Sequence, residues 1–132
     1  MTPLPVRLQP GDDLRERIEA LVQERNVAAA FVVSGIGSLS RVALRYAGAA
    51  RPEVLEGDFE IVALAGSLSA DGAHLHMAIA DGAGRVTGGH VGAGCRVRTT
   101  AEILLALLPG WTFARRRDAA TGYPELVIER DD

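Results

Sequence analysis

Apolar positions near the start of the chain repeat with the spacing of an α-helix. Acidic residues come just before the repeat, and Asp12 or Asp13 can cap the first turn at its positive end. Asn26 is a suitable terminator. The repeat advances three or four residues at a time and consists of Leu14, Ile18, Leu21 and Val22. It predicts one amphipathic helix near the amino terminus.

Most of the remaining chain has the apolar runs or the period-two alternation of strands. The run from 28 to 36 is rich in β-branched residues and has no polar alternation, so it predicts a central strand covered on both faces. Gly35 and Gly37 are expected to interrupt this strand, and Gly66 a later one. Residues 101–108 fit either a strand or a short helix. Other strands are expected at 6–8, 39–46, 60–68, 74–80, 85–91, 96–100, 112–116 and 125–128.

Together these patterns predict an α+β fold: a mostly antiparallel sheet with one clear N-terminal helix. With 132 residues, of which 48% are hydrophobic, the chain has the size and composition of a single domain spanning residues 1–132. The sequence shows no export signal and no apolar stretch of membrane-spanning length, and its single cysteine, Cys95, excludes an intramolecular disulfide. We therefore expect a cytoplasmic protein with no membrane partner.

The charge balance bears on nucleic-acid binding. All 14 basic residues are arginines, and 17 acidic residues outnumber them to give a formal net charge of −3. Because nucleic-acid affinity comes largely from neutralising phosphates, this balance argues against direct DNA binding. The one dense basic run, 115–117, falls on a predicted strand, where consecutive side chains alternate between faces. We interpret it as a solvated strand end.

The three histidines lie near one another in sequence, and a hairpin can bring them onto one face. His74 and His76 are two residues apart on a predicted strand, so they share a face at a separation of roughly 6.5 to 7 Å. A three-residue loop at 82–84 would place His76 opposite His90, whereas a two-residue loop would place Leu75 there instead. The three-residue loop is a common class with glycine in the left-handed position, so the required register is available.

This cluster has the chemistry of a metal site. Three neutral imidazoles that leave a fourth position open suit Zn²⁺, and such a site can activate water for hydrolysis. We therefore name His74, His76 and His90 as candidate zinc ligands. The alternative is that they are hydrogen-bonding residues of a glycine-rich hairpin or of a subunit contact.

Three further residues are candidates for supporting this site. Glu60 and Glu102 each stand in an apolar, strand-like context, so either could orient a histidine by hydrogen bonding to it from behind. An exposed edge or a salt bridge to an arginine is the simpler interpretation of each. Cys95 could be a fourth ligand, but a lone cysteine more often behaves as a small buried apolar residue.

Four stretches, in this order, resemble the plants-and-prokaryotes-conserved (PPC) domain, a family of unknown function also described as predicted DNA-binding. They are RLQPGDDL at 7–14, SGIGS at 34–38, GDFEIV at 57–62, and HLH at 74–76 leading to GGH at 88–90. The resemblance covers roughly residues 6–128. It implies an α+β domain that assembles as a homotrimer. It also implies metal binding, in prokaryotic members, at the positions of His74, His76 and His90. In plants the domain accompanies an AT-hook, an Arg-Gly-Arg-Pro element absent from this sequence, and mediates contacts among regulators.

Two functions of different classes fit these observations. The first is a trimeric PPC-like interaction or regulatory module, whose metal is structural or senses a ligand and which reaches DNA, if at all, through partner proteins. The second is a small zinc-dependent hydrolase with water on the metal, assisted by Glu60 or Glu102. We favour the first. A fourth metal position that opens onto a cleft large enough for a substrate would favour the second.

Overall fold

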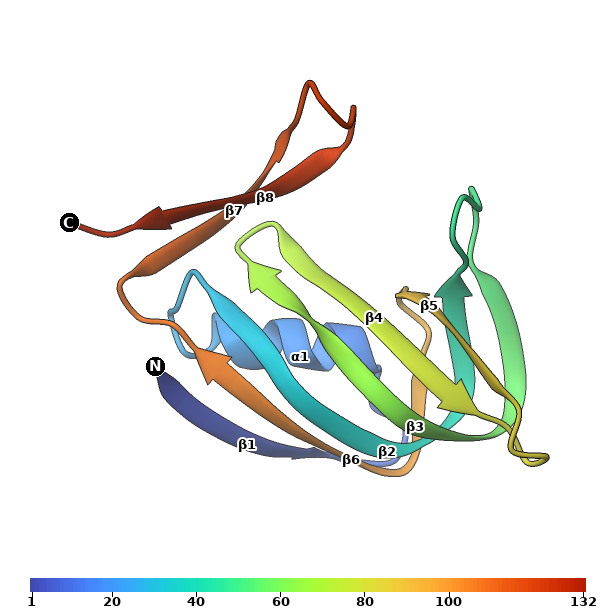
Figure 1. Cartoon of the computed structure of the whole chain (residues 1–132). Coiled ribbons are helices and arrows are strands. Elements are labelled where there is room, and N and C mark those ends of the chain that lie inside the picture. The colour runs from blue at the N-terminus through green and yellow to red at the C-terminus, as the bar shows by residue number, and fades with distance from the viewer.

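The computed structural model describes all 132 residues, and one helix and eight strands make up the chain (Figure 1). The helix, α1, is Leu14–Gln23. The strands are β1 (Thr2–Leu8), β2 (Ala30–Arg45), β3 (Glu53–Ser69), β4 (Gly72–Ala80), β5 (Val86–Val91), β6 (Arg96–Leu107), β7 (Trp111–Arg117) and β8 (Pro124–Arg130). The predicted α+β class, with one helix near the amino terminus, is confirmed.

The first six strands form one curved sheet in the order β1-β6-β2-β3-β4-β5, and every pairing is antiparallel. The far end of β2 also pairs with β5, through Leu44 opposite Val91 and Arg45 opposite His90. This extra pairing curls the sheet towards a partly closed barrel. β7 and β8 form a separate two-stranded hairpin, which Figure 1 shows projecting beyond the sheet next to the start of β4.

The helix forms where the apolar spacing predicts it. Asp13 is the N-cap, and its side chain accepts a hydrogen bond of 3.0 Å from the backbone N–H of Glu16. A second oxygen of Asp13 accepts from the backbone N–H of Gly94 at 2.6 Å, which ties the start of the helix to the β5–β6 connection. After the helix, Asn26 adopts a left-handed conformation with φ of 52° and turns the chain towards β2. The four apolar residues that predicted the helix are all buried against the sheet.

The core lies between α1 and the concave face of the sheet, as Figure 1 shows. Inward-facing residues of every strand of the large sheet contribute to one cluster of 26 buried residues. The prediction that the strand at 28–36 is covered on both faces is wrong for the single chain, because the only helix covers only the concave face. On the convex face of β2, Phe31 is 40% exposed, Val33 57% and Ile36 54%.

Glycines do not break the strands where the sequence suggested. β2 runs without a break through Gly35 and Gly37, β3 runs through Gly66, and the ambiguous segment at 101–108 is part of β6. At Gly66 the φ angle is 154°, and a Cβ atom would collide with the backbone oxygen of His74 on β4. Here glycine permits a close approach of two strands and does not end one.

No helix of the chain is long and apolar enough to cross a membrane.

Gly66 therefore offers a test of this packing. We expect Gly66→Ala to lower the free energy of unfolding by roughly 1 to 3 kcal/mol, because the new Cβ combines an unfavourable φ with a backbone collision. Gly82→Ala is the control, since nothing lies within 4 Å of its Cβ position. Urea denaturation of both variants would measure the difference, and equal midpoints would contradict the prediction.

Candidate metal centre

The β4–β5 hairpin has the register that the three-residue loop predicts. His76 lies opposite His90, and Ala78 lies opposite Gly88. The backbone N–H of Asp81 donates to the carbonyl of Arg85 at 2.9 Å, which closes the loop at the predicted pair. The loop residue Gly84 has φ of 76°, so glycine occupies the left-handed position.

Asp81 holds this loop in shape from outside the sheet. Its carboxylate accepts hydrogen bonds from the backbone N–H groups of Ala83 and Arg85, both at 2.9 Å. These bonds favour the charged form, with the Arg85 bond the larger cause, and they lower the pKa of the Asp81 carboxyl. The sequence alone suggested the loop length but not this clamp.

The three histidine rings converge on one face of the hairpin. The Nε2 atoms of His74 and His76 are 3.1 Å apart, and the ligand nitrogens of the three residues all lie within 4.8 Å of one another. Two nitrogens bound to one tetrahedral Zn²⁺ at about 2.05 Å would be about 3.3 Å apart. The His74–His76 spacing is already close to that value, and a ring nitrogen of His90 lies within 4.8 Å of both.

Burial and neighbouring charge favour the neutral form that a ligand must have. His74 and His90 are half-buried, while His76 is exposed. Burial first, and then the positive charge of Arg45, lower the pKa of His90 to about 4. Burial followed by the charge of Arg115 likewise lowers the pKa of His74. The donor set and its protonation therefore fit a divalent metal.

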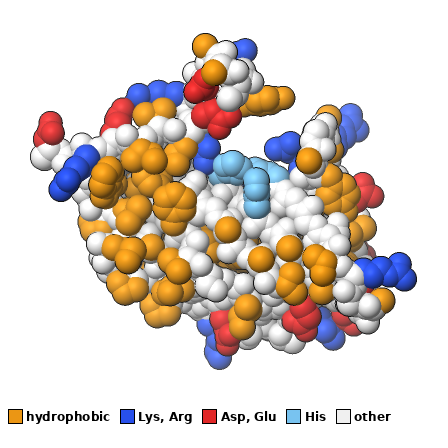
Figure 2. All heavy atoms as spheres, in the orientation of Figure 1, with side chains coloured by type: hydrophobic (Ala, Val, Ile, Leu, Met, Phe, Trp, Pro, Cys, Tyr) orange, Lys and Arg blue, Asp and Glu red, His pale blue; other side chains and the backbone are white.

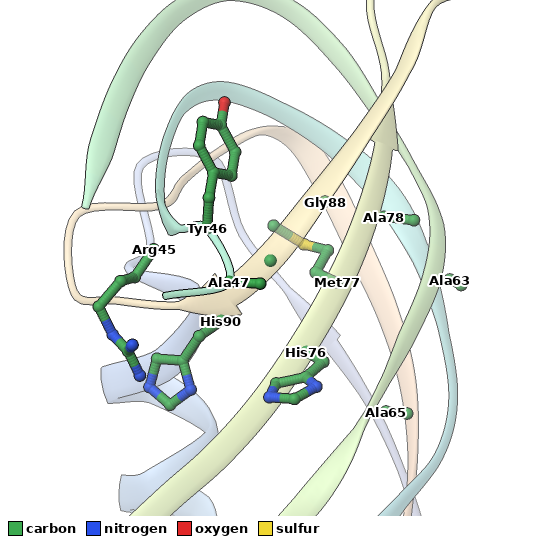
Figure 3. A pocket seen from close by; sticks show the side chains of 11 residues that line it. Arg45, Tyr46, Ala47, Ala63, Ala65, His76, Met77, Ala78, Gly88 and His90 are labelled. Atoms are coloured by element: carbon green, nitrogen blue, oxygen red, sulfur yellow. The ribbon is translucent and has the colours of Figure 1, made fainter. Parts of the chain in front are cut away.

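Two surface hollows meet at the histidines. The first, of about 530 Å³, is bordered by His76 and His90 and by small or apolar side chains, and Figure 3 shows its lining. Its other residues are Arg45, Tyr46, Ala47, Ala63, Ala65, Met77, Ala78, Gly88 and Gly89. The second, of about 550 Å³, is bordered by His74 and His90 and is walled on one side by the β7–β8 hairpin. Figure 2 shows the histidines at the floor of the resulting notch.

The two predicted supporting glutamates lie elsewhere in the single chain. Glu60 and Glu102 are exposed and together border a different hollow, with Ser38 and Thr99. Glu60 pairs with Ala80, four residues along β4 from His76, which is roughly 13 Å. Neither carboxylate hydrogen bonds to a histidine, so their supporting role stays a prediction that this chain alone does not realise.

Cys95 is not a ligand in this arrangement. It is fully buried, its thiol accepts a hydrogen bond from the backbone N–H of Ala43 at 3.3 Å, and burial raises its pKa. It behaves as the small buried residue expected from the sequence.

Arginines around the histidines were missed by the sequence analysis. Arg15 of α1, Arg45 of β2 and Arg115 of β7 border the same hollow as His74 and His90, although they come from distant parts of the sequence. The interpretation of 115–117 as a solvated strand end holds for Arg116 and Arg117, which are exposed, but not for half-buried Arg115. The signal that could have found Arg115 was the alternation of faces along the strand, which turns one of the three residues inward.

Comparisons with known proteins place this chain in a family. A curated relative, the bifunctional protein GlmU of Synechococcus sp. (strain JA-3-3Ab), is 48% identical over 126 residues; these cover 96% of this chain but 20% of that protein. This chain therefore spans about a fifth of the length of that relative.

Solved structures reproduce the whole fold. A hypothetical protein from Salmonella cholerae-suis matches with a TM-score of 0.95 and 42% identity, covering 98% of this chain and 94% of the other. A metal-containing protein from Archaeoglobus fulgidus matches with a TM-score of 0.83 and 27% identity, covering 96% and 94%. The model of the Plants and Prokaryotes Conserved (PCC) domain matches residues 1–109, which include all three histidines and end just before the β7–β8 hairpin. The expected resemblance is confirmed: this chain belongs to the Plants and Prokaryotes Conserved domain family.

Proposed function

We propose that this domain is a homotrimeric interaction or regulatory module whose His74, His76 and His90 hold one Zn²⁺ that can also take a ligand. The observation that carries the proposal is the convergence of three imidazole nitrogens within 4.8 Å on one face of a hairpin. The metal-containing relative from Archaeoglobus fulgidus supports a metal in this fold.

The choice of zinc rests on the donor set. Nitrogen donors from three neutral imidazoles suit a borderline-soft divalent ion better than Mg²⁺ or Ca²⁺, which prefer oxygen. When bound, zinc would supply a Lewis acid with a position free for an outside ligand. The chain itself holds the rings in place through the hairpin register and keeps two of them neutral by burial.

The homotrimer is supported by the convex face of the sheet. Phe31, Val33 and Ile36 on β2 and Val62 on β3 leave apolar surface uncovered by the chain's only helix. Figure 2 shows apolar side chains gathered over one side of the molecule. An exposed apolar patch is typical of an interaction surface, and a closed ring of copies would cover it without leaving open edges.

A small zinc-dependent hydrolase is the second candidate. The hollow of about 530 Å³ beside His76 and His90 meets the condition that a ligand can reach the metal. A carboxylate placed to assist a bound water is the missing part, because Glu60 and Glu102 border a separate hollow. We therefore keep the regulatory role as the proposal. Any contact with DNA would be made through partner proteins, because the chain has 17 acidic residues and only 14 arginines.

Replacing one ligand should remove the metal and leave the fold. We expect wild-type protein to carry one zinc per chain and His76→Ala to carry close to none, because two imidazoles hold zinc far more weakly than three. Cys95→Ala is the matched control, since it removes the chain's only thiol. Elemental analysis beside circular dichroism gives the result, and zinc retained by folded His76→Ala protein would overturn the site. Ester hydrolysis by zinc-loaded wild-type protein that is lost in His76→Ala would favour the hydrolase.

The protonation of His90 gives a pH prediction for metal-free protein. In the folded chain its pKa is lowered to about 4 from the ordinary 6.5, mainly by burial. Between these values the unfolded chain binds more protons than the folded chain, so the free energy of unfolding should fall as pH drops from 6.5 towards 4. An NMR titration of the histidine rings tests the cause directly, and a His90 ring that titrates at or above 6.5 would contradict it.

The trimer has its own test. Light scattering on a size-exclusion column should give three times the chain mass of 13.9 kDa. Val33→Glu should break the assembly, because it places a charge in an apolar contact. Val86→Glu should not, because Val86 is 64% exposed at the end of the β4–β5 hairpin. A wild-type mass of one chain at micromolar concentration would refute the trimer while leaving the metal site untouched.

A further inference from the structure

Three arginines surround the histidine cluster, each from a different element. Nη1 of Arg15 lies 3.5 Å from Nε2 of His90, and Arg45 stands directly opposite His90 in the β2–β5 pairing. In Figure 3 the guanidinium group of Arg45 lies beside the His90 ring. Arg115 donates from Nη2 to the hydroxyl of Ser67 at 3.0 Å, and Ser67 is the cross-strand partner of His74. Positive charge therefore flanks the rings from α1, β2 and β7.

Two of these arginines have no carboxylate partner. Arg15 forms an ion pair with Glu19 at 2.8 Å, and it also donates to the carbonyl of Val91 at 3.0 Å. No carboxylate lies within 4 Å of the guanidinium groups of Arg45 or Arg115, whereas the neighbouring Arg116 pairs with Glu129 at 3.1 Å. Arg45 makes only a long bond of 3.4 Å to the carbonyl of Ala49.

Two acids, Asp71 and Glu125, border the same hollow, and each accepts a hydrogen bond from a neighbouring group. Glu125 accepts a hydrogen bond from the hydroxyl of Thr121 at 3.0 Å. Asp71 accepts from the backbone N–H of Arg115 at 2.8 Å, which fixes that strand without pairing the guanidinium group. Neither acid forms an ion pair with Arg45 or Arg115, so both guanidinium groups remain available to a ligand beside the histidines.

The hollow on the other side of His76 and His90 is apolar. Ala63, Ala65 and Ala78 present only methyl groups there, and Gly88 presents none, so the space of about 530 Å³ is open beside the rings. Arg45 and His90 border both hollows and so lie on the ridge between them. A ligand at the ridge would meet positive charge at one end and apolar surface at the other.

We propose that the histidine centre takes a small organic carboxylate, whose anionic group is held by Arg45 and Arg115 and whose apolar body lies against Ala63 and Ala65. The inference rests on the proposed metal centre and names the class of ligand that reaches it. Guanidinium groups bind carboxylates through paired, charge-assisted hydrogen bonds, and a metal at the histidines would add to the same attraction. A neutral molecule of the same shape gains neither.

Binding of butyrate to zinc-loaded protein tests the inference, with butyramide as the neutral isostere. Isothermal titration should show butyrate bound at least tenfold more tightly than butyramide. Acetate should bind more weakly than butyrate, because it lacks the propyl chain that would lie in the apolar hollow. In protein loaded with Co²⁺ instead of Zn²⁺, butyrate should change the visible spectrum, which reports an anion next to the metal.

Variants test whether butyrate binding depends on these two arginines or on the positive charge of the protein in general. Arg45→Gln and Arg115→Gln should each weaken butyrate binding about tenfold, since each removes a charge-assisted contact. Arg116→Gln is the matched control, because it lies on the same hairpin but pairs with Glu129. Zinc content measured for all three shows whether the metal is retained.

The possible outcomes are distinct. Failure of wild-type protein to bind zinc would refute the proposed function itself. With zinc bound, equal affinity for butyrate and butyramide, or equal effects of Arg45→Gln, Arg115→Gln and Arg116→Gln, would overturn the carboxylate inference alone. Binding of inorganic phosphate without binding of butyrate would overturn it too, because the apolar hollow would then have no part.

Discussion

The site depends on the register of one hairpin. Because side chains alternate between faces, a shift of one residue between β4 and β5 would move His90 to the core side. A core-facing neighbour of His90 would then take its place on the histidine face. The three-residue loop and the carboxylate of Asp81 hold that register from the end of the hairpin, where Asp81 accepts two backbone N–H groups. The pairing of Arg45 with His90 holds it from the other side. The histidine cluster is therefore a consequence of backbone hydrogen bonding, with no need for a metal to draw the rings together.

Local patterns predicted the parts of the fold that local interactions determine. The helix, its Asp13 cap and the β4–β5 register all follow from residues close in sequence, and all are present. The failures concern long-range contacts. Strands were expected to be interrupted at Gly35, Gly37 and Gly66, but at Gly66 the reason for glycine is the backbone of His74 on another strand, which no neighbouring residue reveals. The exposed convex face of β2 could not be foreseen either, because the apolar run does not state how many elements will cover it.

The same division applies to the candidate site. The three histidines were found because two share a strand and the third is one hairpin away. Arg15, Arg45 and Arg115 were not, because the curled sheet and the C-terminal hairpin bring them together from positions up to 100 residues apart in the sequence. Glu60 was named from its apolar context, but that context belongs to an exposed part of β3 distant from the rings. Spacing along a chain can identify candidate metal ligands, whereas the charges around them depend on tertiary structure.

The β7–β8 hairpin contributes one wall of the notch, yet it pairs with no strand of the large sheet and begins after the part of the chain that the family model matches. The residues that would hold the metal and one residue that would choose its ligand thus belong to separate structural units. Lengthening or shortening this hairpin would change the width and charge of the entrance without altering any of the three imidazoles. Selectivity for a ligand could in this way diverge between related proteins that keep an identical histidine cluster.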